Sequence, residues 1–141
     1  MRFAVLGLPA PQGSKRHVGN GVLIESSKKV KPWRADVRAA AVDRMTGQPM
    51  AGALSVTVDF YLPRPKGHYG SGRNAAVLKP SAPAEHITRP DLDKLTRAVG
   101  DALSGLVWRD DSQIIAWRTY KHYATPEHPV GAVITVQELR R

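Results

Sequence analysis

The chain has 141 residues and a formal net charge of +9, from 21 Lys and Arg against 12 Asp and Glu. This length suits one domain with a hydrophobic core, and the positive charge is typical of nucleic-acid-binding proteins, although it can also serve solubility alone. Because the sequence has no cysteine, disulfides, thiolate metal sites and a cysteine nucleophile are excluded. The first residues hold too short an apolar run for a signal peptide, and no stretch could span a membrane. We therefore expect a cytoplasmic protein without a membrane partner.

The first half of the chain is predicted to begin with a strand over residues 2–8, which ends at Pro9 because proline cannot donate to a sheet. A short hairpin is expected around residues 19–21. A helix is then predicted from Pro32 to Met45, since its apolar residues form one stripe. Alternating apolar and polar residues over 53–62 predict a strand with one buried face.

The second half begins with residues 63–87, which are rich in proline and glycine and lack periodicity, so we expect a flexible basic loop. A helix is predicted over about 91–105, because apolar residues recur there at spacings of three and four. Strands are expected over 113–123 and 130–136. This order predicts a single α/β domain over residues 1–141, with a mixed β-sheet and two main helices.

Acidic residues are concentrated in one part of this basic chain, since five of the twelve lie between positions 91 and 111. Asp91 and Asp93 begin the second predicted helix, where the alternative interpretation is a cap that accepts hydrogen bonds from free backbone N–H groups. A cap needs one carboxylate only, and Asp110 and Asp111 follow in a predicted turn. Hard cations such as Mg²⁺ bind several oxygen ligands, so we expect these carboxylates to converge on a divalent ion.

Three segments together resemble the RusA family of Holliday junction resolvases: Pro90-Asp91-Leu92-Asp93, Ala98-Val99-Gly100-Asp101-Ala102-Leu103 and Asp110-Asp111-Ser112-Gln113. These small endodeoxyribonucleases are common in phages and prophages, and the resemblance covers roughly residues 89–121. It implies a RusA-like homodimer, associated with the nucleoid. Such a dimer binds four-way DNA junctions and cuts two strands symmetrically in recombination and repair.

The resemblance also implies Mg²⁺ as the cofactor, with Mn²⁺ as the alternative ion. The metal ligands would be Asp91, Asp93 and Asp111, with Asp110 as a further candidate, and Arg97 would complete the catalytic set. Lys94 stands where the family usually has Asn, and Arg97 where it usually has a catalytic Lys. Arginine keeps the charge but cannot exchange a proton near neutral pH. An ion-pair ladder along the helix surface is the alternative interpretation of Arg97.

Clustered basic residues are the candidates for contacts with the DNA backbone, which depend strongly on salt and little on sequence. They are Lys15, Arg16, Lys28, Lys29, Lys31, Arg34, Arg38, Arg64, Lys66, Arg73, Lys94 and Lys121. His86 is the one histidine of interest, because it lies just before the acidic motif. Two other functions stay open: a branched-DNA-binding module without catalysis, and a nuclease that acts on flaps or forks.

Overall fold

The computed structural model describes residues 1–13, 15–17, 23–25 and 28–140, with the backbone alone for residues 15–17 and 23–25. Its centre is a four-stranded sheet in the order β1 (Arg2–Leu6), β6 (Gly131–Glu138), β4 (Leu54–Leu62) and β5 (Ile114–Tyr123). The first three of these strands pair antiparallel, whereas β5 pairs with β4 in parallel. The predicted α/β fold with a mixed sheet is therefore confirmed, and β5 forms one edge of that sheet.

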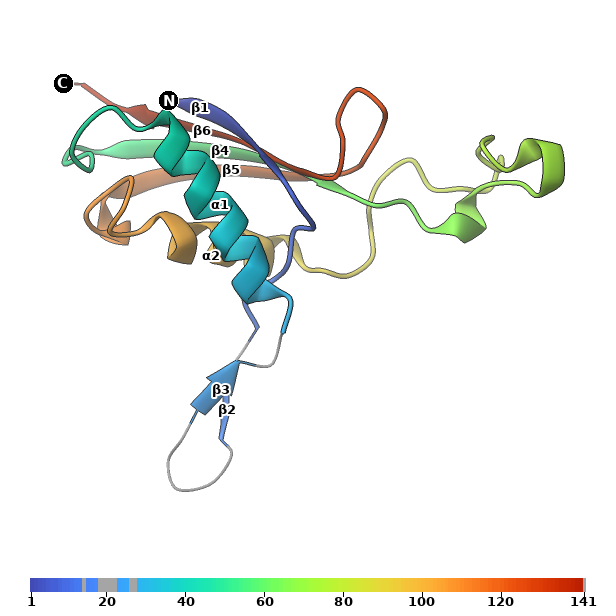
Figure 1. Cartoon of the computed structure of the whole chain (residues 1–141), viewed down its shortest axis with the longest axis horizontal. Helices are drawn as coiled ribbons and strands as arrows, with labels where there is room; N and C mark the ends of the chain where they lie inside the picture. The colour runs from blue at the N-terminus through green and yellow to red at the C-terminus, as the bar shows by residue number, and fades with distance from the viewer. Residues whose placement is uncertain (14, 18–22, 26–27, 141) are drawn as a thin grey trace.

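Two helices, α1 (Val30–Arg44) and α2 (Leu92–Leu103), lie on the same side of the sheet (Figure 1). The alternation predicted for β4 buries Val56, Val58 and Phe60 completely. Val37 of α1 and Val99 of α2 are buried too, as the spacing of three and four predicted. Among the described residues, no helix combines the length and the apolar composition that a membrane crossing requires.

The predicted boundaries differ from the observed ones by a few residues. Helix α1 begins two residues before Pro32, because proline is tolerated throughout the first helical turn, where the backbone N–H has no helical partner. The hairpin is confirmed, since β2 (Lys15–His17) and β3 (Leu23–Glu25) pair antiparallel. Its expected turn at residues 19–21 lies outside the described residues.

The long loop after β4 extends away from the sheet as an arm, which we define as residues 63–84 (Figure 1). It contains two short 3-10 helices, η1 (Lys66–His68) and η2 (Gly72–Asn74). Backbone hydrogen bonds of 2.9 Å join Gly70 N to Val77 O and Lys79 N to His68 O. The arm therefore has internal structure that the sequence did not predict, while its flexibility stays a prediction.

Candidate active site

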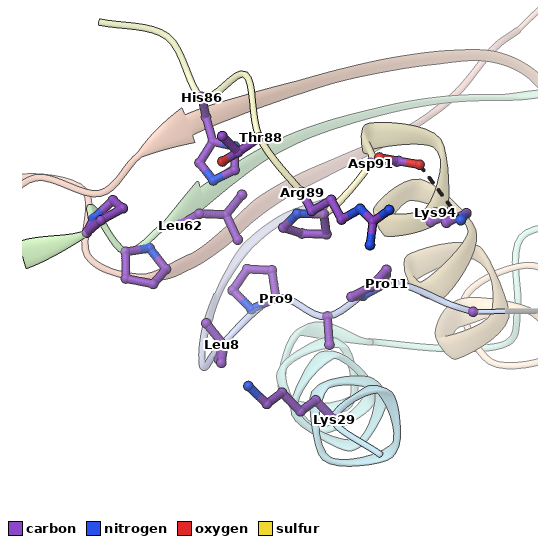
Figure 2. A pocket seen from close by; sticks show the side chains of 15 residues that line it. Leu8, Pro9, Pro11, Lys29, Leu62, His86, Thr88, Arg89, Asp91 and Lys94 are labelled. Atoms are coloured by element: carbon purple, nitrogen blue, oxygen red, sulfur yellow. Dashed lines mark ion pairs between the residues drawn. The ribbon is translucent and has the colours of Figure 1, made fainter. Parts of the chain in front are cut away.

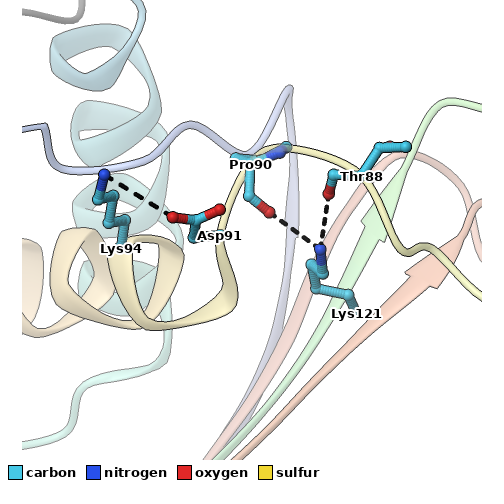
Figure 3. Close-up of polar contacts among 5 residues, drawn as sticks. All are labelled: Thr88, Pro90, Asp91, Lys94 and Lys121. Atoms are coloured by element: carbon cyan, nitrogen blue, oxygen red, sulfur yellow. Dashed lines mark hydrogen bonds and ion pairs between the residues drawn. The ribbon is translucent and has the colours of Figure 1, made fainter.

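The start of α2 presents two carboxylates to solvent. Asp91 takes the N-cap position with extended backbone, and Asp93 lies in the first turn. The side chain of Asp91 makes no capping hydrogen bond; its Oδ2 atom lies 3.8 Å from Nζ of Lys94 (Figure 3). Both of these side chains are about half exposed, so the ion pair is weak. The cap interpretation of Asp91 is therefore wrong, and its carboxylate is available to a ligand.

Lys121 fixes the segment that leads into these carboxylates. Its Nζ atom donates to the carbonyl oxygens of Thr88, at 2.8 Å, and Pro90, at 3.0 Å (Figure 3). Lys121 lies near the C-terminal end of β5, so this end of the strand is tied to the start of α2. The sequence suggested a DNA contact for Lys121, whereas the structure gives it a positioning role that uses two of its three donor protons.

A cavity of about 660 Å³ lies directly beside Asp91. Figure 2 shows Leu8, Leu62 and His86 on one side of it and Arg89, Asp91 and Lys94 on the other. Lys29, the residue that directly precedes α1, also lines the cavity. The cavity thus joins apolar walls to three cations and one carboxylate, which is the composition expected of a site for an anionic organic ligand.

His86 forms a neutral part of this cavity wall. The residue is only 8% exposed, and its ring lies 4.8 Å from that of Tyr123. Burial lowers the pKa of His86, and the nearby Lys121 ammonium lowers it further. The nearby backbone groups of His86 and Thr88 raise the pKa and so oppose this shift. In the described part of the chain, however, no group lies in a position to form a full hydrogen bond with the Nδ1 atom. We therefore treat the imidazole as uncharged at neutral pH.

The second pair of acids lies beyond the other end of α2, around the 3-10 helix η3 (Asp111–Gln113). Asp110 caps η3 by accepting a 2.8 Å hydrogen bond from the Ser112 backbone N–H, which also lowers the pKa of Asp110. The Oδ1 atom of Asp111 accepts a hydrogen bond of 2.8 Å from Nε1 of Trp108. Asp110 therefore has a structural role, while Asp111 remains exposed and keeps its second carboxylate oxygen for a ligand.

The expected convergence of all these carboxylates within one chain is wrong. Ile114, next to η3, and Lys121, next to Pro90, are seven positions apart along β5, which corresponds to about 23 Å of strand. The length of α2, which has twelve residues, gives a similar separation of about 18 Å between its two ends. Two oxygens that share a Mg²⁺ ion lie only about 4 Å apart. Accordingly, no group of three or more His, Asp or Glu residues in the described part of the chain could hold a metal ion.

This error has a simple physical cause. Asp93 and Asp111 are close in sequence, but a rigid helix lies between them and carries the chain from one end of β5 to the other (Figure 1). The described residues contain no ion pair between Asp93 and Arg97, so this step of the alternative ion-pair ladder is not formed. Both side chains are exposed at the same end of α2, one helical turn apart.

The predicted DNA-binding residues divide into two groups. Lys28, Lys29, Lys31, Lys66 and Arg73 are exposed, and the side chains of Lys15 and Arg16 lie outside the described residues. Three arginines instead make contacts within the protein: Arg34 donates to Oε1 of Gln12 at 2.6 Å, Arg38 to the Ala102 carbonyl at 2.9 Å, and Arg64 to the Pro83 carbonyl at 2.7 Å. Arg64 also lies 3.9 Å above the Tyr123 ring, so it ties the base of the arm to β5.

Arg89 is the residue that sequence reasoning missed. It is exposed and lines the cavity beside Asp91, within the acidic motif itself. Its place two residues before the first carboxylate was the signal that could have marked it.

Comparison with known proteins identifies the family. Residues 7–137 match the family described as endodeoxyribonuclease RusA. The chain belongs to the RusA family. This membership makes it a nuclease of the group that resolves Holliday junctions. A relative, the uncharacterized protein YqaN of Bacillus subtilis (strain 168), is 30% identical over 131 residues, which cover 88% of each chain.

Proposed function

We propose that this RusA-family chain is a homodimeric, divalent-metal-dependent endonuclease that cuts four-way DNA junctions by paired symmetric incisions. The observation that carries the proposal is the pair of exposed carboxylates at the start of α2, beside a cavity rimmed by Lys29, Arg89 and Lys94. A polyanion that enters this positive rim brings a phosphate to Asp91 and Asp93. The net charge of +9 favours such a partner over a neutral or cationic one.

The donor set of one chain fits a metal ion only in part. Mg²⁺ keeps several waters and is commonly held by one or two carboxylates together with substrate phosphates, so Asp91 and Asp93 suit it. A bound Mg²⁺ or Mn²⁺ supplies charge neutralisation and a water of lowered pKa. The third carboxylate that the family resemblance implies, Asp111, lies too far away in the same chain. It can reach this site only from a second copy.

The free edge of β5 supports this arrangement. Within the described part of the chain, β5 pairs with β4 alone, and its ten residues include the exposed side chains of Ile115, Trp117 and Tyr120. Such a long open edge is a template for pairing with another strand. If two β5 strands pair antiparallel about a two-fold axis, the η3 end of one chain lies beside the Lys121 end of the other. Asp111 of each copy then approaches Asp91 and Asp93 of its partner.

Arg97 and Lys94 contribute positive charge at the same end of α2. Arg97 is exposed one turn after Asp93, where its guanidinium can stabilise charge on the scissile phosphate but cannot carry a proton. Lys94 partly balances Asp91 until a metal ion and phosphate enter. Lys121 holds the backbone carbonyls of Thr88 and Pro90 and so positions the segment from which Asp91 begins α2.

A cleavage assay tests this proposal directly. With Mg²⁺, the wild-type protein should cut a synthetic four-way junction and leave a linear duplex of the same sequence intact. Asp93→Asn should lower the cutting rate by about 10²-fold or more while junction binding persists, because one ligand oxygen is lost. Asp43→Asn, an exposed acid of α1, is the matched control and should cut normally. Binding without cleavage by the wild-type protein in Mg²⁺ and Mn²⁺ would instead identify a non-catalytic module.

A further inference from the structure

The cavity beside Asp91 is larger and more apolar than a metal ion and a phosphate require. Besides Leu8 and Leu62, its walls contain five prolines at positions 9, 11, 63, 65 and 90. They come from three separate segments: the residues after β1, the start of the arm, and the segment before α2. Rigid rings from three directions form a preformed apolar space, which is costly to leave open to water unless it receives an apolar group.

The polar groups of this cavity narrow the choice of occupant. The lining contains three cations, Lys29, Arg89 and Lys94, and one carboxylate, that of Asp91. The rim therefore carries net positive charge and favours an anionic ligand. The wall opposite contains the ring of His86, an aromatic surface against which a planar group can pack. A planar heterocycle could pack against the apolar and aromatic walls, while a phosphate attached to it meets the cations of the rim. That combination is a nucleotide.

We propose that this cavity receives one unstacked nucleotide of the junction, next to the phosphate that is cut. Its base lies between the proline rings and His86, and its phosphate lies against Arg89 and Lys94. This inference rests on the proposed function and extends it to recognition of the branch. Base pairs at a crossover have lost stacking neighbours, so extruding a base there is far easier than within a continuous duplex. The cavity therefore discriminates a junction from linear DNA.

A second protein chain is the competing occupant of an apolar cavity. With a net charge of +9, a second copy of this chain is a poorer partner for the three cations of the rim than DNA, although the proposed dimer brings its acidic η3 end close to Asp91. DNA brings the opposite charge to the same positions. A test must nevertheless separate these two occupants.

The probe is 2-aminopurine placed at the nucleotide that flanks the crossover, since its fluorescence rises when the base leaves the stack. The full-length protein is added without metal, so that no strand is cut. The key variant is Leu8→Glu, which places a carboxylate in the cavity at a residue that is 44% exposed. The control is Leu6→Glu, which makes the same charge change on β1 at a residue outside the cavity.

The wild-type protein and Leu6→Glu should raise the fluorescence several-fold, whereas Leu8→Glu should leave it near that of free DNA. Junction affinity should fall about tenfold more in Leu8→Glu than in the control, as expected for one lost base contact. An abasic site at the probe position should remove this difference.

Three results would overturn the inference. The first is a bound junction without a fluorescence rise in the wild-type protein. The second is an equal rise in both variants. The third is a change in the oligomeric mass of Leu8→Glu with the signal retained, which would assign the cavity to a second copy. In each of these cases junction binding still supports the proposed function; if the wild-type protein binds no junction at all, both proposals fail.

Discussion

The proposed sharing of carboxylates between two chains makes a sharp prediction for a heterodimer of two inactive variants. One chain carries Asp93→Asn and the other Asp111→Asn. Neither change should disturb folding, because Asp93 is exposed and an asparagine at position 111 keeps an oxygen that can accept from Nε1 of Trp108. Each homodimer lacks an essential carboxylate in both sites, so each should cut at least about 10²-fold more slowly than the wild type.

In the heterodimer the expected cleavage activity depends only on which chain supplies Asp111 to each site. If Asp111 acts in the partner's site, one of the two sites combines Asp91 and Asp93 from one chain with Asp111 from the other, and it is intact. The purified heterodimer, isolated with two different tags, should therefore nick one strand at about half the wild-type rate per dimer. If all ligands came from one chain, both sites would be defective.

The assay measures nicks and paired cuts on a junction with differently labelled strands. A nicking rate near half that of the wild type, with paired cuts absent, supports the shared site. A heterodimer as inactive as the homodimers would refute the reasoning from the length of α2 and β5. Mass measurement of the sample is the control that the two chains have associated.

Two further predictions concern Lys121 and the arm. Lys121→Met removes two hydrogen bonds to backbone carbonyls, so the free energy of unfolding should fall by about 1–3 kcal/mol and cleavage should fall more than junction binding. The control is Arg44→Met, at an exposed residue of α1 with no assigned DNA contact, which should change neither the denaturation midpoint nor the cutting rate. Wild-type cleavage by Lys121→Met would show that the clamp does not position Asp91. Arg73→Ala combined with Lys79→Ala should reduce the slope of log binding constant against log salt by about 2, if each side chain contacts one phosphate. Arg44→Ala with Arg140→Ala makes the same charge change away from the arm, and an equal loss of slope in that control would contradict a specific arm contact.

The sequence predicted the fold better than it predicted the geometry of the site. Alternation in β4 and the spacing of apolar residues in α2 report which side of an element is buried, and both depend only on local periodicity. The structure therefore agrees with the sequence for properties that depend on a single helix or strand, such as which of its faces is buried.

Contacts between elements could not be obtained from these patterns. Lys121, Arg38 and Arg64 read as basic surface residues, but each donates to a carbonyl of a distant segment. Charge alone does not distinguish a side chain that faces DNA from one that faces its own backbone. Asp111 shows a related limit. The predicted helix over 91–105 already implied that Asp91 and Asp111 lie far apart within one chain, but local patterns do not say which ends of neighbouring elements meet.

The separation of the acids has a consequence for how cleavage is controlled. A single chain holds Asp91 and Asp93 at one end of α2 and Asp111 beyond the other, so under the proposed ligand set a monomer would contain two half-sites and no complete one. Under the proposed pairing of β5 edges, a two-fold axis completes both sites in the same event, since the contact that brings one Asp111 into place also brings the other. In this proposal, dimerisation prevents a lone chain from nicking DNA and yields two equivalent sites at once. Paired cuts on a four-way junction require that property, because a single nick relaxes the junction without separating its duplexes.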